Sequence, residues 1–165
     1  MSHSSGTPWM FIAACVLVFY TLGAGLLESY VVYPSWYPLA GSDVFALHHA
    51  SISRSILPFL VGPLLIGFVL SLALLWKRPS AIPTWAMLGS VGLQLVVLIS
   101  TATLFIPIQT ALGQSGQTAL EVSALIDRLR LMGWVRDVPG VINAGLYVWM
   151  LGRVVRGTNL VVGAS

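Results

Sequence analysis

The sequence predicts an all-α fold, an integral membrane four-helix bundle, and two observations lead to that prediction. Hydrophobic residues make up 57% of the 165 residues and charged residues only 8%, whereas soluble domains average about 25% charged residues. The mean hydropathy is +0.90. The second observation is the spacing of uncharged runs, because about 20 apolar residues cross a hydrocarbon core of ~30 Å. Such runs cover residues 9–27, 56–76 and 82–109, and a shorter one covers 138–152.

The chain is expected to form one domain. We predict a polar N-terminal lead-in over residues 1–8, a transmembrane domain over 9–156 and a C-terminal tail over 157–165. No basic segment precedes the first apolar run, so we interpret that run as a retained helix and not as a signal peptide. The single cysteine, Cys15, cannot form an intrachain disulfide.

The distribution of charge bears on topology and on partners. The short, purely basic turn at Lys77 and Arg78 is typical of a cytoplasmic connection, so we expect both termini to be cytoplasmic. The net charge of +3 is then a topology signal. Basic patches interleaved with aromatic residues, which bind nucleic acid, do not occur in the sequence. We therefore expect no nucleic-acid partner.

The first apolar run has signals for both ends of a helix. Pro8 suits the first turn of a helix, and Pro34 predicts that the helix ends before it. Tyr20, Ala24 and Glu28 recur at a spacing of four and share one face. A carboxylate facing lipid is costly, so this face should point into the bundle.

The third run and the segment after it carry further polar patterns. A polar seam comprises Ser90, Gln94, Thr101 and Gln109. We expect Gln94 to hydrogen-bond another helix. Thr118 and Glu121 have the spacing of a capping box, which predicts a helix start. The helix that follows is amphipathic and should lie between the third and fourth spans, on the bundle or at the membrane interface.

Polar chemistry is concentrated between the first two apolar runs, in residues 27–54. We expect this stretch to form a structured extracytoplasmic loop that roofs a pocket. Glu28 or His49 could act there as a general base or proton shuttle. Arg54 and Arg136 could stabilise an anion. The tyrosines and tryptophans nearby are equally typical of an aromatic belt at the membrane interface.

The sequence leaves the cofactor open. Adjacent histidines, His48 and His49, cannot ligate opposite faces of one haem. Glu28 with His48 or His49 supplies the carboxylate and imidazole that suit iron, copper or zinc, but no third ligand is evident.

Several short motifs resemble those of a known family. They are "YPSW" at 33–36, Phe45-Ala-Leu-His48-His49 followed by Arg54, "STATLFIPIQTAL" at 100–112 and "LRLMGWVRDVPGVINAG" at 129–145. Over roughly residues 20–155 they are similar to small four-helix bacterial membrane proteins, mostly domains of unknown function, related to fungal anthrone oxygenases. The resemblance implies a bacterial inner-membrane protein that oxidises a phenolic or anthrone-like substrate with O₂, with no cofactor evident.

The resemblance also bears on individual positions. His49, Arg54, Trp134 and Arg136 match the family pattern, whereas Gln109 stands where many members have a histidine. That departure puts in doubt any chemistry that requires a second histidine. The predicted substrate-binding residues are Tyr30, Trp36, His48, Gln109, Trp134 and Asn143.

Three hypotheses follow for the function. The first is a membrane oxygenase or related tailoring enzyme that takes a lipophilic aromatic substrate from the bilayer. The second is a non-catalytic membrane subunit that binds a quinone, a lipid or a partner helix in the same pocket. The third is a structural ion-pair network of Glu28, Arg54 and Arg136. Expected partners are a lipophilic small molecule, membrane lipid and, as an option, a second copy of the chain.

Overall fold

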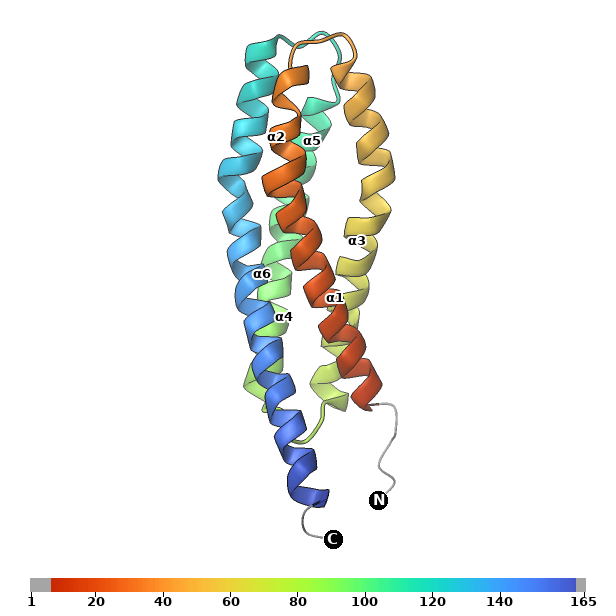
Figure 1. Cartoon of the computed structure of the whole chain (residues 1–165), viewed down its shortest axis with the longest axis vertical. Coiled ribbons are helices and arrows are strands. Elements are labelled where there is room, and N and C mark those ends of the chain that lie inside the picture. Colours follow the sequence, from red (N-terminus) through yellow and green to blue (C-terminus); the bar gives the residue numbers. More distant parts are fainter. Residues whose placement is uncertain (1–6, 163–165) are drawn as a thin grey trace.

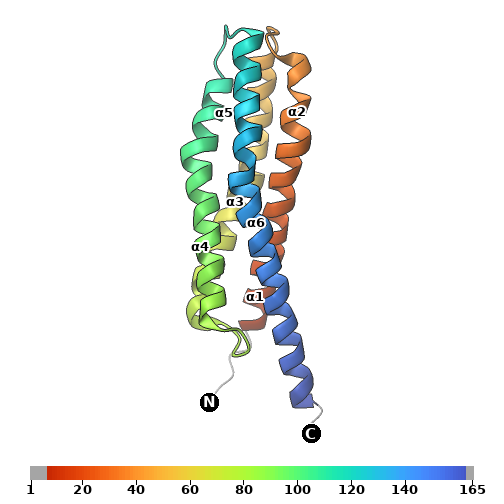
Figure 2. The ribbon, with the colours of Figure 1, turned by 90° about the vertical axis from the view of Figure 1, so that its left-hand side faces the viewer.

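The computed structural model describes residues 7–162, which contain helices and no strand. The helices form four columns. Figure 1 shows these columns running side by side, and Figure 2 shows α6 between the first column and the α4–α5 column. The connections at 40–44 and 113–118 lie at one end of the bundle, which we call the distal end. Within these residues, four helices are long and apolar enough to cross a membrane, which confirms the predicted membrane helix bundle.

The first column comprises α1 (Thr7–Leu27), the π-helix η1 (Glu28–Val32), α2 (Tyr33–Ser35) and the 3₁₀-helix η2 (Tyr37–Leu39). Helical conformation thus continues past Pro34, and the predicted end before that proline is wrong. The backbone N–H of Tyr33 donates to Glu28 O, five residues earlier. This wider turn accommodates the proline, which cannot donate and which crowds the preceding turn. Residues 27–39 are therefore an extension of the first helix and not a roofing loop.

The other columns are equally continuous. They comprise α3 (Phe45–Lys77), then α4 (Thr84–Ser100), the π-helix η3 (Thr101–Phe105) and α5 (Ile106–Leu112), and finally α6 (Ala119–Val162). The predicted amphipathic helix is not a separate element, because it forms the first part of α6. The capping box is confirmed: Thr118 N donates to Glu121 Oε2 at 2.8 Å, and Glu121 N donates to Thr118 Oγ1 at 3.3 Å. These bonds satisfy N–H groups that have no partner within the helix.

The predicted N-terminal lead-in and C-terminal tail lie partly outside residues 7–162. Within that range, α1 already begins at Thr7 and α6 continues to Val162, through the start of the predicted tail. Figures 1 and 2 both show α6 extending beyond the other helices at the end opposite the distal one.

Both π-helices precede a proline by the same interval. Each begins six residues before it: η1 at Glu28 before Pro34, and η3 at Thr101 before Pro107. In η3 the N–H of Ile106 donates to Thr101 O, again five residues earlier. A π-turn holds one residue more than an α-turn, so the side chains beyond it are rotated relative to the helix before it.

Two apolar clusters form the core. One lies around Phe11 and Tyr147, and the other, nearer the distal end, lies around Tyr33 and Phe105. Gln94 Nε2 donates to Ser71 Oγ of α3 at 2.8 Å, which confirms the predicted hydrogen bond between helices. This buried bond fixes α3 against α4 where a free amide would be costly.

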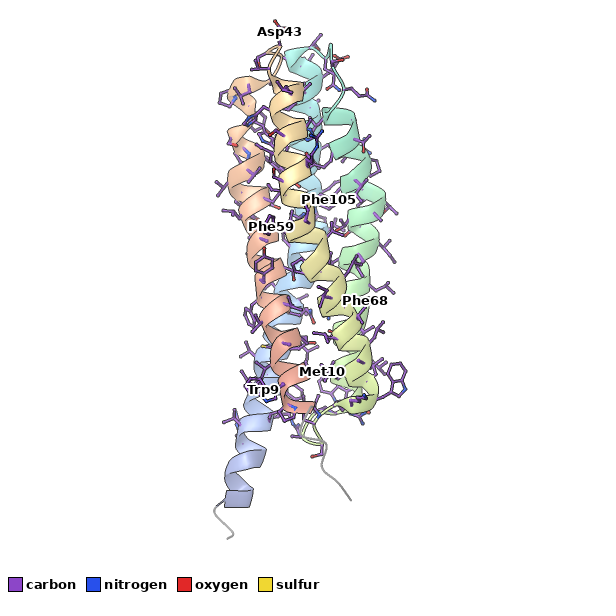
Figure 3. All side chains as sticks on the ribbon, turned by 90° about the vertical axis from the view of Figure 1, so that its right-hand side faces the viewer. Trp9, Met10, Asp43, Phe59, Phe68 and Phe105 are labelled. Atoms are coloured by element: carbon purple, nitrogen blue, oxygen red, sulfur yellow. The ribbon has the colours of Figure 1, made fainter. Side chains whose placement is uncertain are left out.

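The exposed aromatic side chains indicate where a bilayer would lie. Figure 3 shows Trp9 near the end where α1 begins and Asp43 at the distal end. Trp9, Trp76 and Trp85 are exposed, and Lys77 follows Trp76 directly. Exposed tryptophans next to basic residues are typical of a membrane interface. From Trp9 to Glu28 the helix rises by about 28 Å, close to the thickness of a hydrocarbon core.

Two glycines in the distal connections have backbone conformations that favour glycine, but they differ in how closely they are packed. Gly41 and Gly116 have φ angles of +76° and +80°. A Cβ atom on Gly41 would lie 2.8 Å from the backbone nitrogen of Ala119, whereas a Cβ on Gly116 would meet nothing within 4 Å. Gly116→Ala should cost about 1–2 kcal/mol for its backbone conformation. Gly41→Ala should cost more, because the start of α6 must also shift.

Thermal unfolding in detergent, followed by circular dichroism, measures both variants against the parent protein. Equal losses of stability in the two variants would contradict the packing of Gly41 against α6.

Candidate functional site

A cavity of about 490 Å³ lies among the four columns in the distal half of the bundle. Most of its wall surface is apolar. The aromatic and polar residues of the wall include Thr21, Glu28, Tyr33, Trp36, His49, Ser53, Gln94, Thr101, Phe105, Gln109, Thr110, Arg136, Asp137 and Asn143. A largely apolar cavity with a few convergent polar groups is the usual form of a small-molecule site.

The cavity opens sideways, between α3 and α5. The lining residues that are solvent-exposed are Ala50 on α3, Ile106 and Thr110 on α5, and Gly113 just after it. Figure 3 looks onto α3, the helix on one side of this opening. The opening lies toward the distal end of two candidate membrane spans.

Arg136 of α6 is the charged centre of the wall. Its Nη1 donates to Glu28 Oε2 at 2.9 Å, and both side chains are only 12% exposed. Its Nη2 donates to Gly25 O and to Ser29 Oγ, each at 2.9 Å. The guanidinium also lies over the ring of Phe105, with Cζ 4.6 Å from the centroid. A guanidinium so removed from water is stable only because its N–H groups find acceptors and a counter-charge.

Asp137 adds a second carboxylate to this centre. Its Oδ1 lies 3.4 Å from Arg136 Nε, a longer contact than that of Glu28. Asp137 Oδ2 is buried, and none of the described residues hydrogen-bonds it. The stronger partner of Arg136 is therefore Glu28.

A chain of hydrogen bonds leads from Tyr33 to His49. The Tyr33 hydroxyl lies beside the Glu28 carboxylate. Gln109 Nε2 donates to that hydroxyl at 3.3 Å, and Gln109 Oε1 is 2.7 Å from His49 Nε2. Gln109 Oε1 accepts in this arrangement, so His49 donates from Nε2. Groups from α3, α5 and the first column are thereby joined in one network.

The His49 ring is fixed by aromatic neighbours. Trp36 meets it edge-on, with centroids 5.1 Å apart, and Phe45 stacks on it at 6.0 Å. Phe45 precedes His49 by one helical turn on α3, which places both rings on one face. His49 Nδ1 is buried, with no hydrogen-bond partner among residues 7–162. The imidazole therefore has one nitrogen bonded to Gln109 and the other sealed from water.

Six of the predicted site residues line the cavity. They are Glu28, Trp36, His49, Gln109, Arg136 and Asn143. The sequence-based expectation that ionisable groups from different helices converge thus agrees with the geometry for Glu28 and Arg136.

The other four predicted residues lie outside the cavity wall and are exposed: Tyr30, His48, Arg54 and Trp134. Consecutive helical residues point about 100° apart, so His48 faces outward where His49 faces inward. Arg54 does not join Arg136, which removes it from the predicted three-member ion-pair network. Tyr30 and Trp134, 68% and 62% exposed, suit the interfacial aromatic belt instead.

Sequence reasoning did not identify Tyr33, Ser29, Phe105 or Asp137 as parts of this site. Tyr33 and Phe105 adjoin or belong to the π-helices, whose altered periodicity hides which side chains face inward. Asp137 had a simple signal, because it directly follows Arg136.

No group of three or more His, Cys, Asp and Glu residues that could hold a metal ion occurs among residues 7–162. Of the residues considered for a metal, Glu28 and His49 line the cavity, whereas His48 is exposed on the other side of α3. Asp137 is a further carboxylate of this wall, but among the described residues it does not gather with Glu28 and His49 into a group that could hold a metal.

The chain matches no protein-family model, no curated protein and no solved structure. A functional assignment therefore depends on the cavity. Its wall can accept a proton at a carboxylate, stabilise an anion with a guanidinium and exclude water from both.

The pairing of Arg136 with Glu28 can be tested by stability. Arg136→Met leaves the Glu28 carboxylate without its cation and should destabilise the protein by about 3–5 kcal/mol. Adding Glu28→Gln should recover part of that loss, because the unpaired charge is removed. Arg54→Met is the control, and its exposed position predicts a change within about 0.5 kcal/mol. Equal unfolding of the Arg136 and Arg54 variants in detergent would contradict the burial of the pair.

Proposed function

We propose that this protein is a membrane oxygenase that admits a lipophilic phenolic or anthrone-like substrate from the bilayer and oxidises it with O₂. The observation that supports this most directly is the Glu28–Arg136 pair in the wall of an apolar, laterally open cavity. A base and a cation are thus held together where a weakly acidic, lipophilic molecule would sit.

The pair suits proton abstraction because charge is conserved within the cavity. When Glu28 takes a proton from the substrate it becomes neutral, and Arg136 loses its counter-charge. The new phenolate or enolate can then take the place of the Glu28 carboxylate beside Arg136. No net charge is created in surroundings of low dielectric constant, where separated charges are costly.

The geometry favours Glu28 over His49 as the base. His49 has Nε2 bonded to Gln109 and Nδ1 sealed, so neither nitrogen is open to a substrate in this arrangement. We assign His49 and Gln109 the role of orienting the Tyr33 hydroxyl toward Glu28. A hydroxyl group oriented in this way would support the carboxylate as its charge changes.

The oxidation uses O₂ as the oxidant. The deprotonated substrate transfers electrons to O₂ and binds one of its oxygen atoms at carbon. Loss of water from the adduct then converts a CH₂ group into a carbonyl, so the second oxygen atom leaves as H₂O. The protein's part is to form the anion and to keep bulk water away from it.

A non-catalytic role, as in the binding-subunit and structural hypotheses, is favoured by one feature. Glu28 and Arg136 already satisfy each other, and such a pair can serve structure alone. The catalytic and the non-catalytic roles differ in whether O₂ is consumed.

Glu28→Gln should lower turnover of an anthrone by about 10²–10⁴-fold, the usual contribution of general acid–base catalysis. Turnover is measured in detergent or nanodiscs as O₂ uptake together with quinone absorbance. His48→Ala is the control, because His48 is exposed and lies outside the cavity wall, and it should keep parental activity. Circular dichroism establishes that both variants are folded. If the parent protein binds the anthrone but consumes no O₂, the binding hypothesis replaces the oxygenase.

A further inference from the structure

Basic residues gather at the end of the bundle opposite the distal end, which we call the proximal end. It contains the connection at 78–83 and the last turns of α6, which lie at the same end in Figures 1 and 2. Its basic residues are Lys77, Arg78, Arg153 and Arg156. Among the described residues, no carboxylate side chain accompanies them. The nearest one along α6 is Asp137, about 24 Å from Arg153.

Two of these arginines are fixed on the same short connection. Arg153 Nε donates to the backbone oxygen of Ala81 at 3.0 Å, and Arg78 Nε donates to that of Ile82, also at 3.0 Å. Arg78 Nη1 also donates to Leu75 O at 2.9 Å, near the end of α3. Guanidinium groups from two different parts of the chain are therefore held on consecutive carbonyl groups.

Most of the donors of this pair are unused. A guanidinium group has five N–H groups. Arg153 uses Nε, and Arg78 uses Nε and Nη1, but no described residue accepts from the remaining N–H groups. Neither arginine forms an ion pair with a described residue. Two cations fixed on neighbouring carbonyl groups repel each other, and an anion bound to both would replace that repulsion with attraction.

Two tryptophans lie on the bilayer side of Arg153. The guanidinium of Arg153 lies over the ring of Trp149, with Cζ 5.3 Å from the centroid. Trp149, one helical turn closer to the centre of the bundle, packs on Trp85 of α4 with ring centroids 5.2 Å apart. Both indoles are exposed. Exposed indoles beside a cation are typical of the level where lipid headgroups meet acyl chains.

We propose that Arg78 and Arg153 bind the phosphate of an anionic phospholipid. Its acyl chains lie against the indoles of Trp85 and Trp149. Guanidinium groups donate to phosphate oxygens through pairs of N–H groups, which suits the unused donors. An anionic headgroup also neutralises the pair, whereas a zwitterionic headgroup brings an ammonium group that the arginines repel. We call these four residues the proximal lipid site.

The proximal lipid site goes beyond the proposed function and does not depend on it, because the cavity lies in the distal half of the bundle. A headgroup bound there would join the start of α4 to the last turns of α6. Under the predicted topology the site faces the cytoplasmic leaflet, where anionic lipids are concentrated.

Native mass spectrometry of the protein in detergent tests this preference. The protein is titrated with phosphatidylglycerol and with phosphatidylcholine of the same acyl chains. The parent protein should bind its first phosphatidylglycerol about tenfold or more tightly, since each basic residue near an anionic headgroup contributes roughly fivefold. Arg78→Gln/Arg153→Gln should abolish the preference and leave phosphatidylcholine binding unchanged. A parent protein that binds both lipids alike overturns the proposal.

Two matched variants remove the same charge elsewhere. Arg54→Gln/Arg128→Gln changes two exposed arginines of the distal half and should keep the parental preference. Lys77→Gln/Arg156→Gln changes two exposed basic residues of the proximal end. It should lower the preference less than Arg78→Gln/Arg153→Gln does. Equal losses in the two proximal variants would show a general effect of surface charge and overturn the site.

Circular dichroism establishes that each variant is folded. If Arg78→Gln/Arg153→Gln does not fold, Arg153→Gln alone decides, because Arg153 is exposed and makes one hydrogen bond. A several-fold loss of the preference supports the site, and an unchanged preference overturns it.

Inorganic phosphate separates a lipid from a free anion. In tenfold excess over the lipid, it should leave phosphatidylglycerol bound, because it has no acyl chains to lie against the indoles. Displacement of the lipid by inorganic phosphate would assign the arginines to a soluble anion and overturn the proposal.

Discussion

Satisfying the buried guanidinium of Arg136 is the constraint on which the distal half of the bundle depends. A charged group so far from water must have each donor matched, and its partners Gly25, Glu28 and Ser29 all come from one turn and a half of the first column. The first and last columns are therefore joined at a fixed height, although Glu28 and Arg136 are 108 positions apart. The network through Tyr33 then extends this anchor to α5 and α3.

The two π-turns make this arrangement sterically possible. Pro34 and Pro107 would each disturb an ordinary α-helix, and in both columns the chain responds with a wider turn that contributes to the cavity wall. The wider turn changes which side chains face inward. Tyr33 and Gln109, which follow the two π-turns, thereby meet each other across the cavity. The prolines thus determine local backbone geometry and, through it, the composition of the site.

Hydropathy was sufficient to predict the membrane helices, because length and apolar composition determine whether a helix can span. The spacing of Thr118 and Glu121 likewise predicted a helix start through local chemistry alone. Sequence reasoning was wrong where it treated Pro34 as a stop signal, since it could not foresee a π-turn. The same limit explains why the sequence does not reveal that Tyr33, which follows the π-turn, faces the cavity. For Arg54, composition identified a charged residue near the site, but its outward direction depends on the path of α3.

The lateral opening between α3 and α5 determines how the concentration of the proposed substrate must be expressed. Under the proposed function, the substrate would arrive there by two-dimensional diffusion within a leaflet, and its concentration would be a mole fraction among lipids. Partitioning alone raises the concentration of an apolar compound in the bilayer many-fold above its concentration in water. Adding lipid at constant total amounts of protein and substrate would then lower the fraction of cavities that are occupied. A protein that binds its ligand from water would not show this dependence.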